Sequence, residues 1–75
     1  MIKYNRVEET LLYPDRVVLS KTDKFVRIYY KLYKSTLVTQ KYMSVLVKNL
    51  DDDNFIITAY FTDTIKKGEI LWEKQ

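Results

Sequence analysis

The sequence predicts an α+β domain in which a short N-terminal helix packs on a four-stranded antiparallel sheet. Apolar and polar residues alternate in the segment 25–34, as expected for a strand, whose side chains point to opposite faces in turn, and the segments 16–20, 41–50 and 54–62 are also predicted to be strands. Residues 2–13 carry a rough helical stripe, and the connections are short enough to favour antiparallel neighbours. A chain of 75 residues has room for one core, so we expect 1–75 to form a single domain.

One residue, Pro14, is expected to determine where the helix ends and the first turn begins. Pro14 should end the helix, because the residue before a proline is pushed out of the α region. Pro14 and Asp15 then predict a turn into the strand 16–20, and the polar residues 21–24 predict a hairpin connection to the next strand.

The segment 25–34 is expected at the centre of the sheet. We expect its aliphatic face to join the core and its other face to look outward, presenting Arg27, Tyr29, Lys31 and Tyr33. Residues 35–40 fit either a loop or a strand extension. The predicted core consists of Leu11, Leu12, Val17, Leu19, Val26, Ile28, Leu32, Val45, Val47, Ile57, Phe61 and Trp72.

The later connections are polar. Asp51, Asp52 and Asp53 with Asn54 favour a tight turn over a metal site, because the spaced ligands, glycine and distal glutamate of a calcium loop are missing. Residues 66–68 predict another turn. After it, the apolar residues 70–72 are expected to pack against the rest of the domain as an anchor.

The composition excludes several kinds of chemistry. The chain has no Cys and no His, so disulfides, Cys/His zinc sites, thiol nucleophiles and His-based triads are excluded. No cofactor is expected. The sequence has neither an apolar run of the ~18 residues that cross a bilayer nor an apolar signal-peptide core, so we expect a cytoplasmic protein without membrane contact. The net charge of +3 permits a nucleic-acid or acidic-protein partner without requiring one.

Cations, phenols and hydroxyls are expected together on the outward face of the sheet. This mixture suits RNA, because amines neutralise phosphate and tyrosine rings stack on bases. A cluster of Lys, Arg and Tyr could also supply the base, the cation and the acid for RNA cleavage without a metal. The same residues also fit a solvated or packing strand face, or a protein interface, and all three alternatives stay open at this point.

Several motifs resemble a group of small prokaryotic and phage-associated domains with the barnase–EndoU–colicin–RelE (BECR) nuclease fold. They are ETLLYPDRV, RIYYK, KYMSVLVK and, most specifically, ITAYFTDTIKKGE followed by a tryptophan. The resemblance covers about residues 9–73 and implies a RelE-like, metal-independent ribonuclease of a toxin–antitoxin or phage context.

By position, the resemblance assigns catalytic roles to Arg27, Lys31, Thr58 and Tyr60. Further nucleic-acid contacts are expected from Tyr29, Tyr33, Tyr42, Lys48 and Lys66. Domains of this group usually begin with a longer helix that carries a His, whereas this chain begins after such a helix would and has no His. The expected partners are RNA, a cognate antitoxin or other protein, or a second copy in a homo-oligomer. The alternative function is a non-catalytic protein-interaction or self-associating domain that uses the same sheet face.

Overall fold

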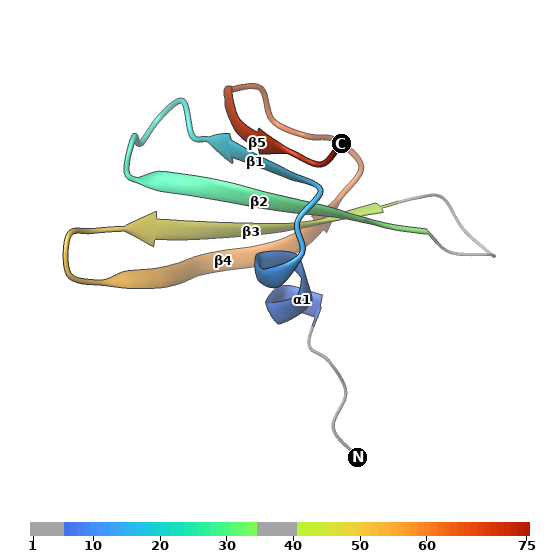
Figure 1. Cartoon of the computed structure of the whole chain (residues 1–75), viewed down its shortest axis with the longest axis horizontal. Helices are drawn as coiled ribbons and strands as arrows, with labels where there is room; N and C mark the ends of the chain where they lie inside the picture. Colours follow the sequence, from blue (N-terminus) through green and yellow to red (C-terminus); the bar gives the residue numbers. More distant parts are fainter. Residues whose placement is uncertain (1–5, 35–40) are drawn as a thin grey trace, which may run out of the picture.

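The computed structural model describes residues 6–34 and 41–75, and shows one short helix with a five-stranded antiparallel sheet (Figure 1). The α+β prediction is therefore confirmed, but the sheet has five strands and not four. The elements are α1 (Arg6–Leu12), β1 (Arg16–Leu19), β2 (Val26–Tyr33), β3 (Lys41–Asn49), β4 (Asn54–Thr62) and β5 (Glu69–Glu73). The predicted helix residues 2–5 and the segment 35–40 lie outside the described residues.

The strand order is β4-β3-β2-β1-β5. The first four strands form the predicted meander, in which each strand pairs with the next. The predicted apolar anchor 70–72 is part of the fifth strand, which pairs with β1 at the edge opposite β4. The connection 63–68 therefore has to pass from one edge of the sheet to the other.

The helix packs on the face that was expected to look outward. Val7 and Leu11 of α1 contact a buried cluster of Met43, Val45 and Val47 on β3. Directly opposed residues of an antiparallel pair share a face, and Tyr29 lies opposite Val45. The Arg/Tyr/Lys/Tyr side of β2 therefore faces the helix, and we call this side of the sheet the helix face.

The opposite side, which we call the crossover face, holds a second cluster that includes Val18, Ile28 and Tyr30. Ile65 of the β4–β5 connection packs on this cluster, and the Lys66 N–H donates to the buried Tyr30 hydroxyl at 3.0 Å. Gly68 allows the connection to approach β1, because a Cβ at this position would lie 2.4 Å from the Leu19 carbonyl oxygen. The centre of the sheet is thus covered on both faces.

Four predicted core residues are exposed. They are Leu12, Ile57, Phe61 and Trp72, and they lie at the end of α1 or on the two edge strands. β4 also departs from the predicted alternation. Ile56 lies opposite Val47 and Thr58 lies opposite Leu46, so Ile57 is an extra, bulged residue between them. Such an extra residue reverses the faces of all side chains on one side of it.

Candidate functional site

Arg27 and Lys31 lie on the helix face. In the ladder between β2 and β3, Arg27 is opposite Val47 and Lys31 is opposite Met43. The Lys31 amine donates to the Tyr13 carbonyl oxygen at 3.0 Å, which ties β2 to the end of the helix. Lys31 also lines an open groove of about 510 Å³ beside the exposed Tyr13 and Trp72.

Thr58 and Tyr60 lie on the other side of the sheet. Thr58 is opposite Leu46, which in turn is opposite Ile28, and all three therefore belong to the crossover face. The expectation that Arg27 and Lys31 converge with Thr58 and Tyr60 on one face is wrong. The sheet itself separates the two cations from the two hydroxyls.

Two of the predicted nucleic-acid contacts are packed beneath the helix. Tyr29 and Tyr33 join the cluster of β3, and the Tyr33 ring meets Phe61 edge-on at a centroid distance of 6.2 Å. The Tyr33 hydroxyl donates to Glu9 of α1, and the Arg6 guanidinium lies 5.1 Å from the ring centroid. Burial, followed by the hydrogen bond to Glu9, raises the pKa of Tyr33. The Tyr33 ring therefore holds the helix on the sheet, whereas Tyr29 packs on the β3 cluster and lines the groove between α1 and β4.

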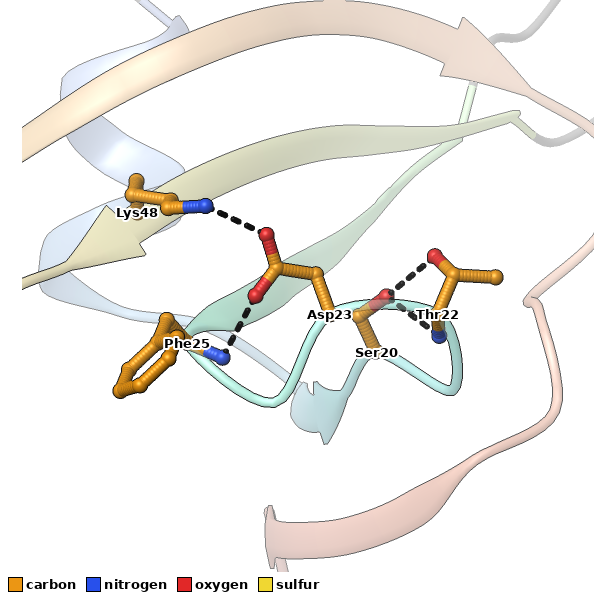
Figure 2. Close-up of polar contacts among 5 residues, drawn as sticks. All are labelled: Ser20, Thr22, Asp23, Phe25 and Lys48. Carbon is orange, nitrogen blue, oxygen red and sulfur yellow. Dashed lines mark hydrogen bonds and ion pairs between the residues drawn. The ribbon is translucent and has the colours of Figure 1, made fainter.

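Lys48 is held by the turn between β1 and β2 (Figure 2). Its amine bonds the Asp23 carboxylate, whose other oxygen accepts the Phe25 N–H at 2.9 Å. The hydrogen bond from Lys48, followed by that from Phe25, lowers the pKa of Asp23. Lys48, which was predicted to contact nucleic acid, is thus a structural partner of this turn.

Tyr42 and Lys66 belong to the crossover side. The Tyr42 ring meets Tyr30 edge-on at 6.3 Å, and the backbone of Lys66 bonds the Tyr30 hydroxyl. The predicted nucleic-acid contacts therefore do not form one surface, because they lie on the helix face, on the crossover face and at one turn. The predicted catalytic residues are likewise divided between the two faces.

The described ranges 6–34 and 41–75 contain no group of three or more His, Cys, Asp or Glu side chains placed to hold a metal ion. Asp51, Asp52 and Asp53 are exposed at the turn between β3 and β4. None of the helices in these ranges has the length and hydropathy needed to span a bilayer.

The feature that sequence reasoning missed is the outer edge of the sheet. β4 runs for nine residues, pairs on one side with β3, and has no neighbouring strand on its other side within the described part of the chain. Large apolar side chains are exposed along it, namely those of Phe55, Ile56, Ile57, Tyr60 and Phe61. One signal was present in the sequence, because Asn54–Thr62 contains no charged residue.

A shallow groove runs along this edge on the helix side. It has a volume of about 500 Å³ and is lined by residues of α1, β2, β3 and β4, among them Leu11, Val47, Phe55 and Ile56. The apolar surface of β4 therefore continues from the strand edge toward the helix.

Comparison with protein-family models, with curated proteins and with solved structures finds no match to this chain. The resemblance to the BECR nucleases stays a prediction from the sequence motifs. The functional argument consequently depends on the geometry of this molecule.

Proposed function

We propose that this chain is a non-catalytic protein-interaction domain that binds a polypeptide partner as an additional strand along β4. The observation that carries this proposal is the nine-residue, uncharged edge strand with exposed apolar side chains. Backbone N–H and C=O groups on an open edge pair readily with an extended segment, and this mode of binding is common in peptide recognition. The partner strand we expect is extended, uncharged and apolar, to match β4.

The other edge of the sheet offers a useful contrast. β5 has five residues and carries Glu69 and Glu73 at its ends. Short length and charged residues are common means by which proteins protect sheet edges from pairing. Of the two edges, β4 is therefore the one suited to accept a strand.

The arrangement favours binding over RNA cleavage. General acid–base catalysis requires the reacting groups to lie within hydrogen-bond reach of one substrate. Arg27 and Lys31 lie across the sheet from Thr58 and Tyr60, and the Lys31 amine already bonds Tyr13. A ribonuclease built from these four residues would need a substrate that reaches both faces at once.

A fluorescent peptide with the sequence of residues 54–62, flanked by lysines for solubility, tests strand binding directly. Its anisotropy should rise on addition of the dilute full-length protein. A control peptide with proline at the position of Tyr60 keeps the charge but loses a backbone donor, and should bind much more weakly. Equal binding of both peptides, or of neither, would contradict strand addition.

Incubation of the protein with single-stranded RNA in EDTA tests the competing ribonuclease function. We expect the RNA to remain intact. Cleavage that disappears in both Arg27→Ala and Lys31→Ala variants would show that the domain is catalytic and that these residues act in spite of their separation from Thr58.

A further inference from the structure

We infer that the strand bound by β4 is β4 of a second copy of this chain, paired antiparallel to form a continuous sheet. This inference rests on the proposed function and names the partner. Antiparallel pairing of two identical edges creates a two-fold axis and a closed dimer, since each copy offers the same patch to the other.

The distribution of charge along the sheet carries the argument. The turn that precedes β4 exposes three carboxylates, those of Asp51, Asp52 and Asp53. Beyond the other end of the strand, Lys41 pairs with Asp63 at 2.7 Å. One further exposed lysine, Lys34, follows Tyr33, which lies opposite Lys41 at this end of the sheet. One end of β4 therefore carries three carboxylates, and the other carries two lysines against one carboxylate, so the strand is acidic at one end and weakly basic at the other.

This polarity selects one orientation. In an antiparallel pair, the acidic turn of each copy lies beside the basic end of its partner, and the attraction occurs twice. In a parallel pair, acidic turns meet each other and basic ends meet each other. Opposite potentials across an interface favour correct pairing, and like charges oppose it.

The strand itself fits pairing with its own copy. The bulge at Ile57 leaves Thr58–Thr62 as the regular part of β4, with Thr58, Tyr60 and Thr62 on the crossover face. Antiparallel pairing around this segment brings Thr and Tyr side chains opposite one another, and hydroxyl and aromatic cross-strand pairs are favourable. No charged side chain of β4 would be buried, because the strand has none.

Sedimentation velocity of the full chain over micromolar to millimolar concentrations tests the dimer. We expect a monomer–dimer equilibrium that Thr58→Lys weakens about tenfold or more, because a pair of like charges enters the new ladder. Tyr60→Lys is a second disruptive variant, should the first fail to fold. Ile70→Lys is the matched control, because it places the same charge on the exposed strand at the other edge and should leave the dimer intact.

The orientation has its own tests. Added salt should weaken an antiparallel dimer, whereas it would strengthen a parallel one by screening its repulsion. The chain has no Cys, so Phe55→Cys and Thr62→Cys variants can be cross-linked cleanly. Disulfides should form in a mixture of the two variants and not in either one alone, since antiparallel pairing brings opposite strand ends together.

The outcomes separate this inference from the proposed function. A monomer at all concentrations that still binds the 54–62 peptide would overturn the second copy as partner and leave strand binding in place. A monomer that binds no peptide would overturn both. A dimer that Thr58→Lys and Tyr60→Lys leave unchanged, or self-cross-linking of the single variants, would also overturn the inference.

Discussion

β2 and β4 reverse the usual relation between charge and burial. β2 carries Arg27 and Lys31, yet Val26, Ile28 and Tyr30 on it are buried. β4 is uncharged and rich in apolar residues, yet seven of its nine residues are exposed. The difference comes from position, because β2 has two neighbouring strands and covered faces while β4 is an edge. An apolar strand that remains exposed is a surface available to a partner.

Two isoleucine substitutions provide the largest test of this comparison. Ile28→Ala removes buried methyl groups from the crossover face and should cost about 2–5 kcal/mol of unfolding free energy. Ile57→Ala, at a position 49% exposed, should cost less than about 1 kcal/mol. Urea denaturation at concentrations below dimer formation measures both. Similar costs would mean that β4 is covered even in the monomer.

Two tyrosines allow a finer comparison. Tyr30→Phe leaves the Lys66 N–H without its acceptor and should destabilise the fold by about 1–3 kcal/mol. Tyr60→Phe removes the same hydroxyl from the exposed strand and should change stability by less than about 0.5 kcal/mol in the monomer. Thermal denaturation of dilute samples distinguishes them. A Tyr30→Phe protein as stable as the wild type would show that the connection 63–68 does not depend on this bond.

The smallest effect is expected at the turn where Asp23 bonds Lys48. Because the native pKa of Asp23 is lowered from its ordinary value of 3.8, its stabilisation is present above about pH 4 and is lost as the pH falls through the native pKa. Asp23→Asn should remove this part of the acid sensitivity while Asn still accepts the Phe25 N–H.

Denaturation midpoints between pH 2 and pH 7 measure the effect. Lys48→Met is the matched partner, since it removes the principal cause of the lowered pKa. A difference between wild type and Asp23→Asn that grows as the pH falls would have the wrong sign and would contradict this account.

Much of the local structure was predictable because it depends on neighbouring residues. The period-two pattern predicted four strands, and β4 has the predicted bounds Asn54–Thr62. β5 was missed as a strand, because its apolar residues Ile70, Leu71 and Trp72 form a short run without alternation. A short apolar run of this kind does not distinguish a strand from another anchored segment.

The candidate site was mispredicted because of strand register. Tyr29 pairs with Val45, and this register puts Lys31 on the same face as Met43 and Val47. A shift by a single residue would have placed Ile28 opposite Val45 and turned Arg27 and Lys31 away from that core. No local pattern distinguishes these two registers, although they reverse which face of β2 receives the helix.

The sequence by itself determined the fold class, the consecutive strand pairing, the absence of Cys and His chemistry, and the uncharged character of β4. Only the tertiary structure decided which faces are covered, which side chains share a face, and that β4 and β5 are the two edges. The physical reason is that alternation and turn residues act over a few neighbours, whereas face and edge depend on contacts between distant segments. Val7 and Leu11 on β3, and Ile65 on the Tyr30 cluster, are contacts of this kind.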